Sequence, residues 1–135
     1  MLFDETRLIE RFRSYAEMDT TSDETSQSLP SAAGEWKLAE HLAEELRRIG
    51  MKNVQVTPYG YVLAVLPAQG KQKPVMGLIA HMDTSPEMSG RHVNPRIIEN
   101  YAGNDIVLNK EKGIVLSTEE FPELMNYVGQ TLITT

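Results

Sequence analysis

Apolar residues in the first fifty positions recur with the spacing of two amphipathic helices, three and four residues apart. Asp4 is placed to cap the first helix and Ser31 the second. The polar, proline-containing stretch 19–31 between them predicts a loop. Gly50 follows the second helix, where a helix commonly ends. The apolar face of the first helix is Leu8, Ile9, Phe12, Tyr15 and Ala16, and that of the second is Trp36, Ala39, Leu42, Ala43, Leu46 and Ile49.

Beyond Gly50 the apolar residues form short runs, which predict strands. Val54 and Val56 alternate with polar residues, and a turn at 58–60 leads to a second strand over 61–66. The run 75–80 is typical of a buried strand in a mostly parallel sheet. Further strands are expected at 97–98, 106–108, 114–116 and 131–135, with a short helix over 118–127. This order predicts an α/β fold, a mostly parallel sheet flanked by helices, in one domain over residues 1–135.

Composition narrows the possible functions. The 135 residues carry a net charge of −6 and show no basic block, so neither a nucleic-acid partner nor a basic membrane anchor is expected. No cysteine is present, which excludes disulfides, thiolate metal sites and cysteine nucleophiles. No apolar run approaches the roughly 20 residues that cross a bilayer, and the early acidic residues do not resemble a signal peptide. A cytoplasmic location is the expectation.

One motif could carry chemistry. His81 and Asp83 follow the predicted strand 75–80 directly, and functional groups gather at the carboxyl ends of strands in open α/β sheets. A histidine there can offer a ring nitrogen to zinc, and an aspartate two residues on can orient that ring. So short a motif occurs often by chance, and a lone histidine at a strand end more commonly has a structural role. One imidazole also cannot hold zinc alone. His41, expected on the surface, and His92, in a loop, add no clear ligand.

Other catalytic motifs are missing. There is no G-x-S-x-G elbow for a serine nucleophile and no glycine-rich loop for a nucleotide. The H-x-H patterns of other metal hydrolase classes are also absent, which counts against a different class of metal hydrolase.

The residues around His81 resemble the first metal motif of the M20 metallopeptidases, and the chain as a whole resembles their peptidase T branch. The resemblance rests on segments 75–86, 93–95, 99–101 and 129–135, on Gly34 to Leu38, and on Arg11-Phe12, Tyr15, Asp19-Thr20, Ser89-Gly90, Asp105-Ile106 and Phe121-Pro122. It implies that His81 binds one of two zinc ions and that Asp83 is a catalytic residue that orients this ligand. It further implies a zinc-dependent aminopeptidase that releases the N-terminal residue from tripeptides.

The same resemblance implies that several parts of the family's site are missing from these 135 residues. They would be the N-terminal segment of the catalytic domain, without the glycine-alanine-aspartate-aspartate motif, the glutamate pair, a further aspartate, the last histidine, or the inserted lid domain. The isolated chain is therefore expected to be inactive and to bind zinc weakly or not at all. The alternative is a non-catalytic binding or assembly module on the same half-fold, with self-association through its exposed surface.

Overall fold

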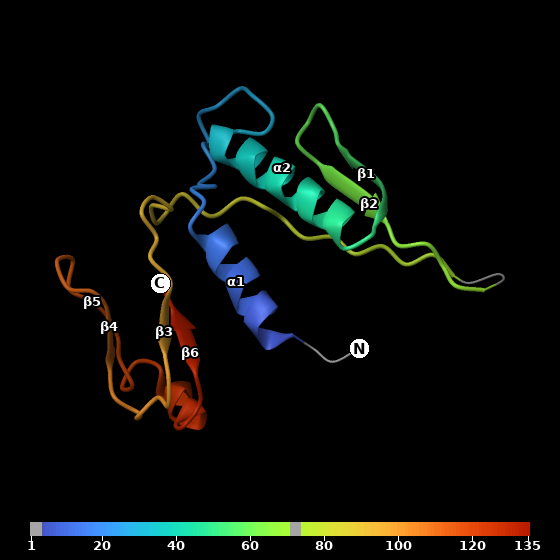
Figure 1. The fold of residues 1–135 in the computed structure, drawn as a ribbon. Coiled ribbons are helices and arrows are strands. Elements are labelled where there is room, and N and C mark those ends of the chain that lie inside the picture. Colours follow the sequence, from blue (N-terminus) through green and yellow to red (C-terminus); the bar gives the residue numbers. More distant parts are fainter. Residues whose placement is uncertain (1–3, 71–73) are drawn as a thin grey trace. The chain divides into compact units, whose positions relative to one another are not determined.

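The computed structural model describes residues 4–70 and 74–135, which form two compact units, Met1–His92 and Val93–Thr135. Within the described residues, the first unit contains helices α1 (Glu5–Ala16) and α2 (Ala33–Arg48) and strands β1 (Lys52–Val56) and β2 (Val62–Val65) (Figure 1). The second unit contains β3 (Arg96–Ile98), β4 (Ile106–Asn109), β5 (Ile114–Leu116), the 3₁₀ helix η1 (Pro122–Tyr127) and β6 (Leu132–Thr134).

Both predicted helices are confirmed, and local chemistry explains their ends. The side chain of Asp4 accepts a hydrogen bond from the backbone N–H of Arg7, as the cap prediction requires. Ser31 is not the cap of α2: Ala32 holds that position, and the Glu35 carboxylate reaches back to its N–H at 2.9 Å. At the other end, Gly50 adopts a φ of +92°, a conformation that glycine reaches without strain.

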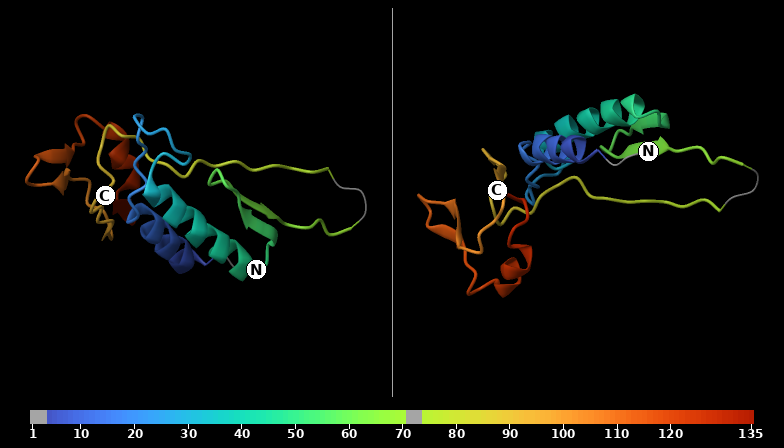
Figure 2. Two further views of the ribbon diagram at one scale, coloured as in Figure 1. Left: turned by 90° about the horizontal axis from the view of Figure 1, so that it is seen from above. Right: turned by 60° about the horizontal axis from the view of Figure 1, so that its bottom comes forward.

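Helix α2 packs against the β1–β2 hairpin, as Figure 2 shows from two sides. It also provides the buried apolar side chains of the first unit, as far as this unit is described. Leu38, Ala39 and Ala43 are buried on this face. Helix α1 contributes no fully buried residue, and Leu8 and Phe12 of its predicted apolar face remain about half exposed. The predicted apolar stripe of α1 therefore exists, but the described part of the chain leaves it partly exposed.

The second unit has a small apolar core around Tyr101, Ile106 and Leu124, with side chains from β3, β5 and β6 against it. Strand β3 pairs with β6, and β4 with β5. The strands predicted in this unit are confirmed, whereas the predicted helix 118–127 is reduced to η1. Pro122 begins η1, and Thr118 lies before it and donates to the Asp105 carboxylate through its N–H and its hydroxyl.

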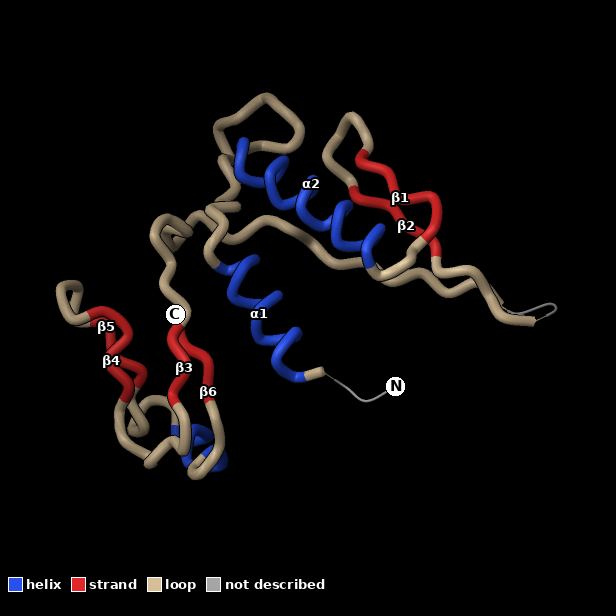
Figure 3. Tube along the Cα trace, in the orientation of Figure 1, coloured by secondary structure: helices blue, strands red, loops and turns tan. Residues whose placement is uncertain are grey.

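The prediction of a mostly parallel sheet is wrong for this chain. Within 4–70 and 74–135 the named strands form three two-stranded antiparallel sheets, so the architecture is α+β. Residues 75–80 are an extended, exposed segment rather than a buried strand (Figure 3), and Ile79 is fully exposed. A strand needs a partner for its backbone groups, and the described residues supply none for this run.

The only parallel strand contact among the described residues is a single bridge between Thr21 and Thr84. It joins the loop after α1 to the loop that follows 75–80, and so lies next to His81 and Asp83. The same described residues include no helix long and apolar enough to cross a membrane.

Candidate functional site

His81 and Asp83 form a local pair on the loop after residues 75–80. The His81 Nδ1 atom lies 2.8 Å from the Asp83 carbonyl oxygen and 3.2 Å from the Asp83 Oδ1 atom. Both of these oxygens accept hydrogen bonds, so the Nδ1 atom must carry a proton and donate it. In the neutral ring the lone pair then lies on Nε2, which is the form of histidine that can bind a metal.

Exposure leaves this lone pair accessible. The His81 side chain is 84% exposed and that of Asp83 44% exposed. The pair thus holds one ring nitrogen of His81 and leaves the other accessible, while the role in metal binding that the H-x-D spacing suggested stays a prediction. The described residues contain no group of three or more His, Asp or Glu side chains that could hold a metal ion. Since zinc takes about three or four protein ligands, these residues alone do not make a zinc site.

The backbone around this pair is held by the loop that follows α1. The Thr84 N–H donates to the Thr20 carbonyl oxygen at 3.0 Å, and the Ser22 N–H donates to the Thr84 carbonyl oxygen at 3.0 Å. A side-chain contact continues the link, because the Gly90 N–H donates to the Thr21 Oγ1 atom at 3.0 Å. Sequence reasoning missed this connection. The Asp19-x-Thr21 spacing, which favours a local side-chain hydrogen bond, was the signal available.

The other two histidines, His41 and His92, make no hydrogen bond or ion pair with His81 or Asp83 among the described contacts. His41, expected on the surface, is half-buried and lies edge-on to the Tyr15 ring, with 5.7 Å between ring centres. His92 has a φ of +58° in the loop before the second unit, and no hydrogen bond or ion pair of its ring occurs among the described contacts. The expectation of a surface position is thus only partly met for His41, and His92 had no predicted role.

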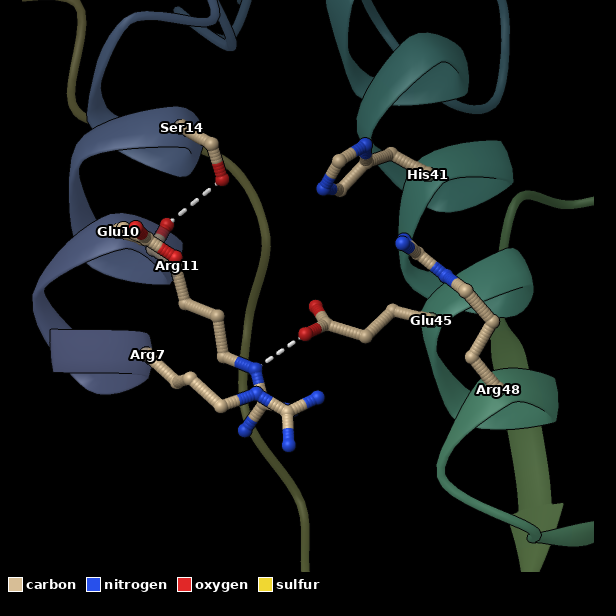
Figure 4. Close-up of a pocket in the computed structure, with 7 residues that line it drawn as sticks. All are labelled: Arg7, Glu10, Arg11, Ser14, His41, Glu45 and Arg48. Carbon is tan, nitrogen blue, oxygen red and sulfur yellow. Dashed lines mark hydrogen bonds and ion pairs between the residues drawn. The ribbon is translucent and has the colours of Figure 1, made fainter. Parts of the chain in front are cut away.

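A second polar cluster lies between α1 and α2, where Figure 4 shows the Arg11 guanidinium directed at the Glu45 carboxylate. The Tyr15 hydroxyl donates to the other oxygen of the same carboxylate. Burial, together with the hydrogen bond and the negative charge of Glu45, raises the pKa of Tyr15 to about 12. Burial of Glu45 opposes its ionisation, yet the bonds from Tyr15 and Arg11 outweigh it and lower the Glu45 pKa.

The contacts of Glu45 with Arg11 and Tyr15 tie the two helices together. The Glu45 carboxylate is already occupied by a guanidinium and a phenol, so it has no spare basicity for catalysis. The candidate site of the chain is therefore the His81–Asp83 pair.

Comparison with known sequences agrees with the family motif. The chain is 57% identical over 131 residues to a protein named peptidase T from Caldanaerobacter subterraneus subsp. tengcongensis, covering 96% of the chain and 32% of that protein. It is 56% identical over 129 residues to the peptidase T of Geobacillus kaustophilus and 54% identical over 129 residues to that of Clostridium acetobutylicum, covering 31% and 32% of those proteins. The chain thus spans about a third of the length of these relatives. No protein-family model matches it.

Proposed function

The chain belongs to the peptidase T family, and from that premise we propose that it serves as part of a metal-dependent aminopeptidase that releases the N-terminal residue from tripeptides. The 135 residues are the N-terminal segment of an M20-type catalytic domain in this proposal. One observation carries it: the sequence similarity includes an intact H-x-D motif whose ring nitrogen Nε2 is free while Nδ1 is held.

His81 is the metal ligand in this proposal, and Asp83 is the catalytic residue that orients it. Asp83 accepts the Nδ1 proton, fixes the tautomer and makes the Nε2 atom a stronger donor. The metal is zinc, two ions in each complete site. Because the described residues supply one ligand of the three or four that zinc takes, no hydrolytic step is assigned to these residues alone. The isolated chain is accordingly inactive and binds zinc weakly.

A chimera tests the enzymatic role directly. The 131 matched residues of the Caldanaerobacter protein are replaced by those of this chain, and hydrolysis of a tripeptide with a free amino terminus is measured. The chimera is expected to be active, His81→Ala to abolish the activity, and Asp83→Asn to lower it by about 10- to 100-fold, the usual effect of losing an orienting partner. His92→Asn, which tolerates the left-handed backbone, is the control and keeps full activity.

Two results would contradict the proposal. The first is an inactive chimera that nevertheless folds and binds zinc. The second is tripeptide hydrolysis by the purified 135-residue chain, because one ligand cannot assemble the site.

The alternative, a binding or assembly module, has one observation in its favour. The side chains of Val75, Met76, Leu78 and Ile79 are between 82% and 101% exposed in one continuous segment. Exposed apolar patches mark interaction surfaces, and an unpaired extended segment also leaves backbone groups free. Light scattering on the purified chain distinguishes the readings, since a clean monomer contradicts assembly through this segment. The cytoplasmic location stays a prediction, which fractionation of cells that express the protein would test.

A further inference from the structure

The peptide group between Asp83 and Thr84 is hydrogen-bonded on both sides. Its carbonyl oxygen accepts from the His81 Nδ1 atom at 2.8 Å. Its N–H donates to the carbonyl oxygen of Thr20 at 3.0 Å. One planar unit therefore connects the imidazole ring to the loop that follows α1, and a rotation of that plane would disturb both hydrogen bonds.

The loop end of this connection is well anchored. Thr20 is only 2% exposed, and the Ser22 N–H and hydroxyl both donate to the Thr84 carbonyl oxygen. Residues on both sides of Thr21 thus contact Thr84, which follows Asp83 directly. Because the two segments touch through backbone atoms, the position of the 19–22 loop determines where the Asp83–Thr84 peptide lies.

A side-chain network adds a second attachment a few residues later. The Thr21 hydroxyl donates its only proton to the Asp19 Oδ1 atom at 2.8 Å, and so it is free to accept the Gly90 N–H at 3.0 Å. The Arg91 Nε atom lies 3.4 Å from the Asp19 Oδ2 atom. The Thr21 hydrogen bond to Asp19 leads the causes that lower the Asp19 pKa, so this carboxylate stays an acceptor at neutral pH.

Gly90 has no room for a side chain in this contact. A β-carbon there would meet the Thr21 Oγ1 atom at 2.7 Å and the Asp19 Oδ1 atom at 3.0 Å. Distances this short force a displacement of the loop or of the hydroxyl. The loop that carries His81 and Asp83 is therefore fastened at Thr84 and again at Gly90.

We propose that Asp19 and Thr21 are positioning residues for His81. Their contacts with Gly90 and Arg91 hold the 84–91 loop against the 19–22 loop, where Thr20 and Ser22 bind Thr84. In this way they fix the Asp83–Thr84 peptide, and with it the tautomer and direction of the imidazole. The assignment of His81 as a metal ligand rests on the proposed function. The positioning itself does not, because it is a property of the metal-free chain. Asp19 and Thr21 touch neither substrate nor metal in this account, and they act only through the loop.

The sequence contains a matched control for this proposal. Asp23 and Thr25 repeat the local motif, since the Thr25 N–H and hydroxyl both donate to the Asp23 Oδ1 atom, as those of Thr21 do to Asp19. The Thr25 hydroxyl accepts no hydrogen bond from the 84–91 loop among the described contacts. Thr25→Val therefore removes the same local interaction without touching the loop.

The experiment compares Thr21→Val with Thr25→Val in the metal-free 135-residue chain. Long-range ¹H–¹⁵N NMR at about pH 8.5, where an ordinary imidazole is neutral, reports the His81 tautomer, and hydrogen exchange reports the Thr84 and Gly90 amides. Thr21→Val is expected to shift His81 from the Nδ1–H form toward the Nε2–H form. Exchange at the Gly90 amide, which loses its acceptor, should rise about five- to tenfold, the loss expected for a net hydrogen bond. Exchange at the Thr84 amide should rise less, because its acceptor is the Thr20 carbonyl oxygen and only the neighbouring attachment is lost. Thr25→Val should change neither the His81 tautomer nor the exchange rates. Thr21→Ser, which keeps the hydroxyl, should give the tautomer and the exchange rates of the unchanged chain.

Gly90→Ala disturbs the same contact between Gly90 and Thr21, but through a change in the 84–91 loop. It tests the proposal even if the Thr21→Val chain does not fold. It is expected to give the same tautomer shift, because the added β-carbon displaces the loop from Thr21. An unchanged His81 tautomer in a folded Thr21→Val or Gly90→Ala chain overturns the proposal. A chimera that folds and binds zinc but is inactive in the peptidase assay would instead overturn the proposed function and leave these readouts intact.

Discussion

Three carboxylates of this protein act as hydrogen-bond acceptors that fix nearby side chains. Asp83 holds a histidine ring, Asp19 orients a threonine hydroxyl, and Glu45 joins two helices. The sequence made the first of these predictable, because His81 and Asp83 are two residues apart. It could not reveal the contact between Thr21 and Gly90, which are separated by 69 positions, since only the folded chain brings them together.

Tyr15 offers a test of the cluster between the helices. With a pKa of about 12 in the folded chain against 10.0 ordinarily, its stabilising effect is complete below pH 10 and is lost as pH rises through about 12. Tyr15→Phe should remove this alkaline decline and cost about 1 kcal/mol of unfolding free energy at neutral pH, through the hydrogen bond to Glu45. Urea unfolding across the alkaline range measures both. Tyr59→Phe, at an exposed turn residue, should change neither.

Asp105 gives the opposite pH dependence in the second unit. The N–H and hydroxyl of Thr118 hydrogen-bond to it and lower its pKa. Its contribution to stability is therefore present above the ordinary carboxyl pKa and is lost as pH falls through the lowered value. Asp105→Asn should flatten the acid side of the stability profile, measured by urea unfolding from neutral to acid pH. An equal flattening with Glu119→Gln, which removes a neighbouring exposed carboxylate, would count against a specific role for Asp105.

At the scale of elements, local signals in the sequence were enough to predict the helices but not to predict how the strands pair into sheets. The ends of α1 and α2 follow from residues such as Asp4 and Gly50, whose effect depends on their immediate neighbours. Residues 75–80 have the composition of a buried strand, but a strand forms only with a partner, and the described chain supplies none. The same limit explains why the parallel sheet was predicted wrongly, whereas the short strands of both hairpins were located correctly.

Gly34, in the first turn of α2, tests how closely this helix approaches the loop after α1. Helix propensity alone favours alanine over glycine by about 1 kcal/mol. A β-carbon at Gly34 would however lie 1.6 Å from the Asp19 carbonyl oxygen, a backbone atom that cannot turn aside. We expect Gly34→Ala to lower the unfolding free energy by about 2 to 3 kcal/mol in urea unfolding. Gly77→Ala, where a β-carbon meets nothing within 4 Å, is the control; an equal loss there would refute the explanation.

At the scale of the whole molecule, the exposed apolar run 75–80 can be compared with the greater length of the relatives. The chain matches about a third of each peptidase T, and its most apolar strand-like segment is uncovered. The amino-acid composition could not predict that residues 75–80 are exposed, because composition gives the number of apolar residues and not which of them are buried by packing. The family motif, by contrast, was recognisable in the sequence, since it depends on the order of residues alone.

Self-association should follow if the uncovered segment meets a second copy of the chain. Burying one exposed isoleucine or leucine contributes about 1.5 to 3 kcal/mol. Association also costs about 4 to 15 kcal/mol of translational and rotational freedom, so the apolar side chains of this segment from both copies would have to be buried together. Ile79→Lys is expected to return the mass measured by light scattering toward that of the 15.2 kDa chain. Tyr59→Lys, which changes an exposed residue in the β1–β2 turn, should leave the mass unchanged.

The held Nδ1 proton of His81 also decides how this ring reacts with electrophiles. A free imidazole alkylates at either nitrogen and gives a mixture of products. In this chain one nitrogen is committed to Asp83, while the other is solvent-exposed and carries the lone pair. Alkylation of His81 should therefore yield a single regioisomer, substituted at Nε2, and a fluorophore or spin label attached in this way would sit at the position that the proposed metal would take.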